Sequence, residues 1–204
     1  MYFMKTVSKI MIACAALLLG LTFIAPLWKI SLWAPQYPEG LVLKIWTSKF
    51  SGDVQTVNIL NHYIGMKPIT EANFPELQYF PKIFGFLMAL GLAVAILGKR
   101  MGAYFYSLVL VCFSVWAMYD FYNWEAKFAA DLNPDAAIKM EEMVYQPPLI
   151  GEKTLLNIVV SSWPDIAGYA MVLSVLLVIG VSLLEFKDRK KLASAVAPAL
   201  LVFF

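Results

Sequence analysis

Four stretches of about twenty residues with almost no charge constrain this chain more than any other feature of its sequence. Because a helix needs about 20 mostly apolar residues to cross the hydrocarbon core of a bilayer, each stretch predicts one transmembrane helix. The composition agrees, since 61% of the residues are hydrophobic and only 15% are charged, against about a quarter in soluble domains. We therefore predict an all-α polytopic membrane protein with spans over residues 10–28, 80–98, 102–121 and 165–184.

Two polar segments, residues 29–79 and 122–164, separate these spans, and the positive charges indicate on which side they lie. With four spans, Lys5 and Lys9, Lys99 and Arg100, and the Lys187–Lys191 cluster all fall on one side. The positive-inside rule makes that side cytoplasmic, together with both charged terminal segments. We expect the two polar segments to form a small extracytoplasmic cap on a bacterial inner-membrane protein. Residues 1–191 then form one membrane domain, and the apolar residues 192–204 form either an interfacial tail or a shortened fifth span.

The first polar segment contains one strand-like and one helix-like pattern. Residues 41–46 alternate in the manner of a short strand, and Val54, Val57, Leu60 and Ile64 mark one face of a helix that follows Asp53. Gly65 suits the left-handed residue that ends such a helix. The segment therefore predicts a helix over about 54–64.

The same segment holds the strongest candidate for a metal site. His62 is the only histidine in the chain, and Met66 follows it by four positions, which is about one helical turn. Thioether and imidazole are ligands that suit copper. Met143, in the second polar segment, offers a further thioether. The same residues are also compatible with an ordinary helix end, so the spacing leaves both readings open.

Several functional classes lack support in the sequence. The net charge of +2 and the absence of a basic patch argue against nucleic acid. No ionisable residue lies deep within a predicted span, which argues against an ion-coupled transporter. A catalytic triad, a phosphate-binding loop and an HExxH motif are all missing, and Cys14 and Cys112 form no CxxC pair. We therefore expect a protein that is not an enzyme.

Several stretches together resemble one known family. They are Ala34–Leu41, Asn58–Ile69, Phe74–Leu77, Tyr119–Trp124 and Tyr145–Gly151. The chain is similar, over both polar segments and the adjoining helix ends, to the small polytopic membrane proteins encoded in nitrous-oxide reductase (nos) gene clusters. The resemblance implies a role in denitrification, as an accessory or assembly factor for a periplasmic copper enzyme. It would supply copper or support electron delivery on the outer face.

Carried over by position, the residues of interest are His62, Met66, Asp120, Trp124, Lys139, Met143, Tyr145 and Gln146. The first hypothesis is transient copper handling at His62 and Met66, completed by Met143, with a copper enzyme or a copper chaperone as the partner. The second is a structural subunit that docks a partner protein through the cap and uses no metal. The third is a quinol site near Asp120 and Trp124. The chain departs from the expected turn before Met143, where it has Glu141 and Glu142.

Overall fold

The computed structural model describes residues 3–137, 146–155 and 157–200. The chain divides into two compact units, each of which is described by itself below. The helical unit comprises Met1–Gly20, Gly85–Phe113 and Ala170–Phe204, and the sheet unit comprises Leu21–Phe84 and Ser114–Tyr169.

Among the residues that the structure describes, four helices are long and apolar enough to cross a membrane, as expected for a multi-pass membrane protein. They are α1 (Thr6–Leu18, extended by the 3₁₀ turn η1, Leu19–Phe23), α3 (Phe80–Leu97), α4 (Arg100–Ala130) and α5 (Ile166–Leu200). The first helix ends before the predicted residue 28, because Trp28 already begins a strand. Helix α4 continues past 121 to Ala130, and α5 runs through residue 191 without a break.

Close packing and serine hydroxyl groups hold the helical unit together. Gly91 of α3 faces Tyr106 of α4, where an added Cβ would lie 2.5 Å from the Tyr106 hydroxyl oxygen, so only glycine fits. The hydroxyl of Ser174 on α5 donates to the backbone carbonyl of Ala15 on α1 at 2.7 Å. The hydroxyl of Ser107 on α4 donates to the carbonyl of Val178 on α5 at 2.9 Å. These bonds satisfy polar groups that cannot reach water inside a helix bundle.

One end of the helical unit contains a buried ionic cluster around Glu185 of α5. This side chain is fully buried, and its carboxylate lies 2.6 Å from Arg100 Nε. The same carboxylate accepts hydrogen bonds from the hydroxyl of Ser8 at 2.6 Å and from the backbone N–H of Lys5 at 3.1 Å. Three helices, α1, α4 and α5, are therefore tied together through one acid.

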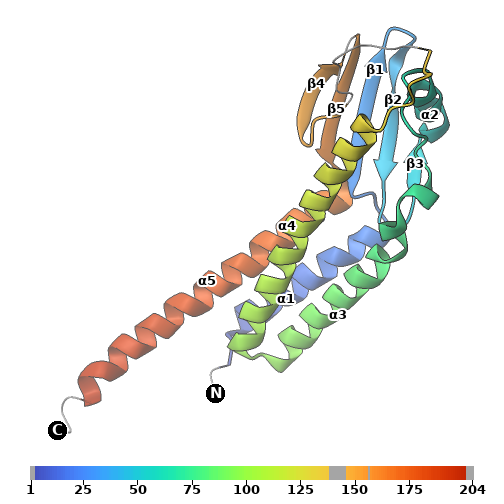
Figure 1. Ribbon diagram of the computed structural model, residues 1–204. Coiled ribbons are helices and arrows are strands. Elements are labelled where there is room, and N and C mark those ends of the chain that lie inside the picture. Colours follow the sequence, from blue (N-terminus) through green and yellow to red (C-terminus); the bar gives the residue numbers. More distant parts are fainter. Residues whose placement is uncertain (1–2, 138–145, 156, 201–204) are drawn as a thin grey trace. The chain divides into compact units, whose positions relative to one another are not determined.

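The sheet unit corrects the prediction of a purely helical protein, because it contains a five-stranded antiparallel sheet. Its strands are β1 (Trp28–Ala34), β2 (Tyr37–Ile45), β3 (Phe50–Gly52), β4 (Gly151–Leu155) and β5 (Ile158–Pro164), in the order β3-β2-β1-β5-β4 (Figure 1). The central strand β1 pairs with β2 from its own segment and with β5 from the second polar segment. Strands from both polar segments thus share one sheet.

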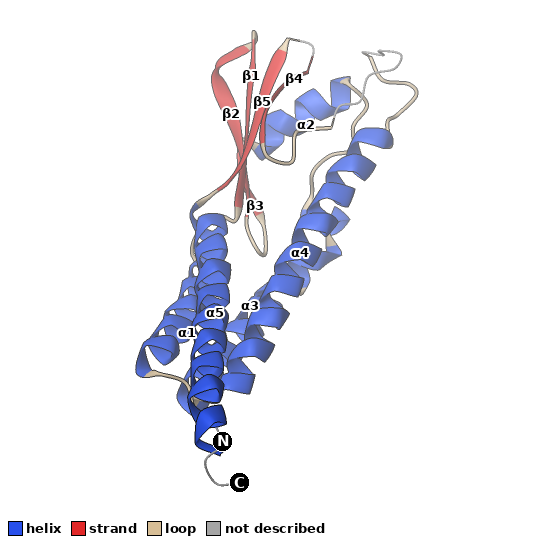
Figure 2. Cartoon of the chain, turned by 90° about the vertical axis from the view of Figure 1, so that its left-hand side faces the viewer, coloured by secondary structure: helices blue, strands red, loops and turns tan. Residues whose placement is uncertain are grey.

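One face of this sheet carries the core of the unit. Helix α2 (Val54–Tyr63) and the final turns of α4 lie on that face, as Figure 2 shows. The two short 3₁₀ turns η2 (Glu71–Asn73) and η3 (Pro75–Gln78) follow α2 and place Phe74 and Leu77 in the core. The buried core residues are Trp28, Ile30, Leu41, Leu43, Val57, Ile69, Phe74, Leu77 and Val160. Burial alternates over Trp28–Ile30 of β1 and Leu41–Leu43 of β2, as expected for strands with one face covered.

Candidate functional site

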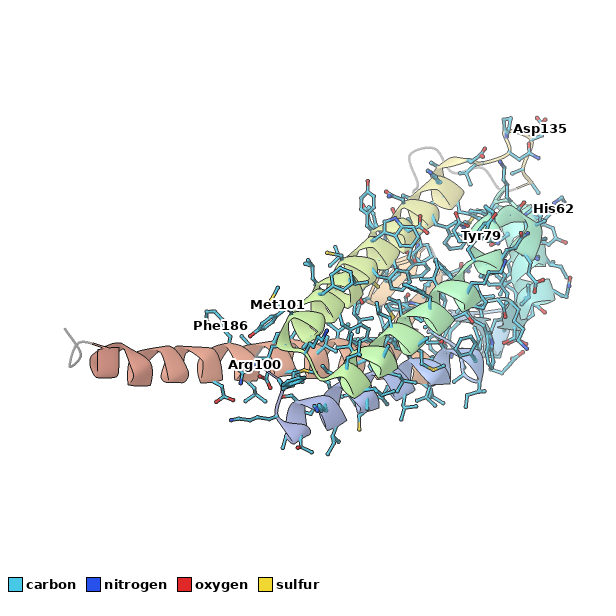
Figure 3. All side chains as sticks on the ribbon, turned by 90° about the horizontal axis from the view of Figure 1, so that it is seen from below. His62, Tyr79, Arg100, Met101, Asp135 and Phe186 are labelled. Carbon is cyan, nitrogen blue, oxygen red and sulfur yellow. The ribbon has the colours of Figure 1, made fainter. Side chains whose placement is uncertain are left out.

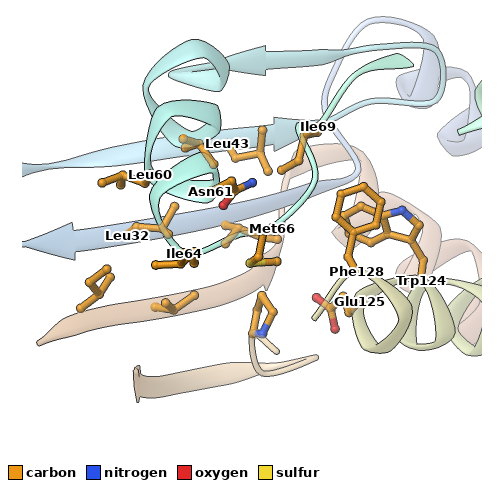
Figure 4. Close-up of a pocket in the computed structure, with 15 residues that line it drawn as sticks. Leu32, Leu43, Leu60, Asn61, Ile64, Met66, Ile69, Trp124, Glu125 and Phe128 are labelled. Carbon is orange, nitrogen blue, oxygen red and sulfur yellow. The ribbon is translucent and has the colours of Figure 1, made fainter. Parts of the chain in front are cut away.

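The core face of the sheet contains a cavity of about 100 Å³ (Figure 4). Its floor is the sheet, and its walls come from α2, from the segment that follows α2, and from α4. The lining residues are Ile30, Leu32, Leu43, Val57, Leu60, Asn61, Ile64, Met66, Ile69, Trp124, Glu125, Phe128, Pro147, Ile158 and Val160. Most of these side chains are apolar, so the few polar ones determine what the cavity can bind.

The segment after α2 is fixed in a way that places Met66 in the cavity wall. Gly65 has a φ of +80°, a left-handed conformation that ends the helix, as predicted. The N–H of Met66 then donates to the carbonyl of Asn61 at 2.8 Å. Asn58 holds the segment further along, since its side chain bonds both the carbonyl of Ile69 at 3.0 Å and its N–H at 2.7 Å.

Glu125 is the least expected residue of this cavity. It is 1% exposed, and neither carboxyl oxygen has a hydrogen-bond partner among the residues that the structure describes. The neighbouring Trp124 has a buried indole N–H that also lacks a partner within those residues. Figure 4 shows the Glu125 carboxyl group directed into the cavity, on the side of Met66. Both neighbouring residues therefore carry a buried polar group without a partner in the described part of the chain, and the carboxyl group is the one that faces the cavity.

The span predicted over residues 102–121 ends before Glu125. The apolar stretch of α4 ends near residue 121, and Glu125 and Lys127 follow it within the sheet unit. Thirty-one residues of helix are also longer than the ~20 that a bilayer core requires. Burial raises the pKa of the Glu125 carboxyl to about 8, because desolvation disfavours the charged form.

This shift predicts how stability depends on pH. A carboxyl whose pKa is higher in the folded state than in the unfolded state stabilises the fold fully below its unfolded pKa. That contribution is lost as the pH rises through about 8. We expect the melting temperature of the wild type to fall between about pH 5 and 8, and the Glu125→Gln variant to lack that fall. The exposed Glu39 supplies the control, because Glu39→Gln should keep the wild-type slope. Equal slopes for wild type and Glu125→Gln would contradict this assignment.

His62 and Met66 do not lie on one turn of helix. Helix α2 ends at Tyr63, so the four-position spacing no longer corresponds to one helical turn, and the geometric premise of the pair is wrong. The His62 side chain is exposed at the surface of the sheet unit (Figure 3), with the Tyr63 ring at 6.2 Å. Met66 lines the cavity, whereas His62 is not among its lining residues.

The other predicted residues also lie in different places. Trp124 lines the cavity and packs on Phe74 and Phe128, with ring centroids 4.6 and 4.7 Å apart, so it is a core residue. Asp120 is half-buried on α4 and outside the lining. Gln146 accepts a bond from Lys153 Nζ through its backbone carbonyl at 3.4 Å. Lys139, Met143 and Tyr145 lie outside the described residues.

Sequence reasoning missed Glu125 as a cavity residue, since an acid near a predicted membrane interface is usually solvated or paired. One signal was present. Glu125 follows Phe121 by four positions and precedes Phe128 by three, which places it on the apolar face of the helix. Within residues 3–137, 146–155 and 157–200, no group of three or more His, Cys, Asp or Glu side chains has an arrangement that would hold a metal ion.

Comparison of the chain with protein-family models, with curated proteins and with solved structures finds no match.

Proposed function

We propose that this protein is a membrane accessory factor for a periplasmic copper enzyme of the nitrous-oxide reductase type, with the sheet unit on the outer face. The observation that carries the proposal is the position of Met66, whose side chain lines a cavity in the sheet unit. The sequence resemblance supplies the copper enzyme as the partner. The orientation follows from the lysine and arginine residues that precede α1, join α3 to α4, and lie along α5.

A thioether within a mainly apolar cavity favours Cu(I) over harder cations, because Cu(I) prefers soft ligands. Pro147 lines the same cavity, and Met143 precedes it by four positions in the sequence. Met143 is proposed as a second thioether ligand from the resemblance alone. His62, exposed on α2, is proposed as a less important contributor.

Competition with a chromogenic Cu(I) chelator tests this proposal. We expect the purified protein to bind Cu(I), and Met66→Leu to weaken binding by about tenfold or more, which corresponds to about 1.4 kcal/mol. Leucine keeps the volume and apolar character of the side chain and removes the sulfur atom. Met101→Leu is the matched control, since Met101 is 74% exposed in the helical unit and should not affect binding.

The effect of His62→Ala, measured in parallel, ranks the two ligands. If His62→Ala abolishes binding while Met66→Leu does not, the surface histidine carries the site and the cavity does not. Absence of Cu(I) binding at micromolar concentrations would contradict the copper role altogether.

A further inference from the structure

We infer that the cavity binds the oxygen-bearing end of a neutral, lipid-soluble molecule, such as a quinol or quinone, through the carboxyl group of Glu125, beside the ring of Trp124. This inference does not depend on copper. It assigns Glu125 a role in binding, and it places a quinol-type site in a cavity that Trp124 lines and Asp120, the other residue of the predicted quinol site, does not.

Buried polar groups without hydrogen-bond partners destabilise the sheet unit. A buried polar group without a hydrogen-bond partner destabilises a protein by about 1–3 kcal/mol, and native proteins contain few such groups. Here two of them, Glu125 and Trp124, are adjacent in the sequence and line the same cavity. A position that served only to pack the core would be occupied at lower cost by leucine or methionine. The Glu125 carboxyl group, which faces the cavity, is therefore best explained by a ligand that satisfies it.

The chemistry of the carboxyl group restricts the ligand. A carboxyl group accepts when it is ionised and both donates and accepts when it is protonated. A ligand hydroxyl can donate to an oxygen of Glu125. A ligand carbonyl can accept from the protonated carboxyl group. The two oxidation states of a quinone present these two groups.

The lining of the cavity also restricts the kind of ligand that can bind. Apart from Asn61 and Glu125, the remaining walls are apolar or aromatic, which disfavours a hydrated ion and favours a ring or a hydrocarbon chain. Trp124 and Phe128 offer ring surfaces 4.7 Å apart in centroid distance. The volume of about 100 Å³ is below the ~150 Å³ of an engineered cavity that binds benzene. The polar end and the first carbon atoms fit, and the rest of the molecule extends outward.

The binding experiment uses the full chain in nanodiscs of phosphatidylcholine, with a copper chelator present so that the result is independent of the copper proposal. The probes are 2-methyl-1,4-naphthoquinone, its reduced form kept under argon, and 1-dodecanol, which offers a hydroxyl without a ring. We expect saturable binding of the naphthoquinone and an increase in melting temperature. Glu125→Leu should weaken binding about tenfold or more, the equivalent of losing one hydrogen bond.

Two further variants make the result decisive. Glu125→Gln keeps a donor and an acceptor and should bind within about threefold of wild type, whereas Asp120→Asn, on the same helix but outside the lining, should bind like wild type. Glu125-dependent binding of dodecanol alone would support the hydroxyl chemistry and identify an aliphatic ligand. If no probe binds, or if Glu125→Leu and Glu125→Gln bind like wild type, the cavity holds water only and the inference is overturned. Loss of binding in Asp120→Asn alone would overturn it by moving the site to the surface.

Discussion

Replacing Phe74 by alanine is expected to lower the free energy of unfolding of the sheet unit by about 3–5 kcal/mol, as for other buried phenylalanines. Phe74 is 6% exposed and lies at the centre of an aromatic cluster. Its ring packs on Phe50, Trp124 and Phe128 with centroid distances of 5.0, 4.6 and 5.4 Å. The segment that carries it has only short 3₁₀ turns on either side, so neighbouring backbone bonds do little to hold it. Removal of the ring therefore leaves a cavity between α2, α4 and the sheet.

Thermal unfolding followed by tryptophan fluorescence measures this effect, because Trp124 belongs to the cluster. Tyr63→Ala is the matched control, since Tyr63 is an aromatic residue of the same unit with 50% exposure. A surface substitution of this kind changes stability by about 0.5 kcal/mol or less. Similar losses of stability in the two variants would show that Phe74 is not central to the core.

The second large effect is expected in the helical unit, where Arg100→Met removes the ion-pair partner of Glu185. Removing one member of a buried pair typically costs about 3–5 kcal/mol, because the remaining charge is left uncompensated. Glu185 is fully buried, and the Arg100 side chain is 13% exposed. The serine hydroxyl and the backbone N–H that also bond Glu185 are neutral donors and do not replace the lost charge.

A double variant separates the cost of a buried charge from the loss of packing. Arg100→Met combined with Glu185→Leu should recover most of the lost stability, since apolar replacements of buried pairs are often neutral or stabilising. The neighbouring exposed Lys99 provides the control, and Lys99→Met should behave like wild type. The test is the melting temperature, measured in detergent, of the wild type, Arg100→Met, the double variant and Lys99→Met. If the double variant is no more stable than Arg100→Met, the ion pair contributes through shape and not through charge.

The sequence predicted the four spans because each one is a local property of about twenty consecutive residues. Helix α2 and its stop at Gly65 were also predictable, since periodicity and a glycine are local signals. The sheet was not predicted, for two reasons. The run to Trp28 was read as part of the first span, which hid the alternation that continues from Trp28 to Ala34. The pairing of β1 with β5 joins residues such as Trp28 and Pro164, and a single sequence carries no signal for such a distant pair.

Some residues of the candidate site were likewise predictable from the sequence and others were not. Met66 was chosen for its residue type and its position in a polar segment, Trp124 was chosen through the family resemblance, and both line the cavity. The one-turn geometry of His62 and Met66 failed because it assumed that the helix continues past Gly65. Glu125 was missed because acids are almost never fully buried without a partner, so residue type argued against it. Its burial is produced by side chains from the sheet and from α2, which lie far away in the sequence.

The position of β5 also determines when the sheet can be completed during synthesis. Strand β1 can pair with β2 after a two-residue turn. Its other edge can pair only with β5, which is synthesised about 130 residues later. At about 5–20 residues per second, this interval is on the order of ten seconds. During that time two helices must enter the membrane while β1 exposes a row of unpaired N–H and C=O groups. Because β5 leads directly into α5, closure of that edge and insertion of the last helix become nearly simultaneous events in the biogenesis of the protein.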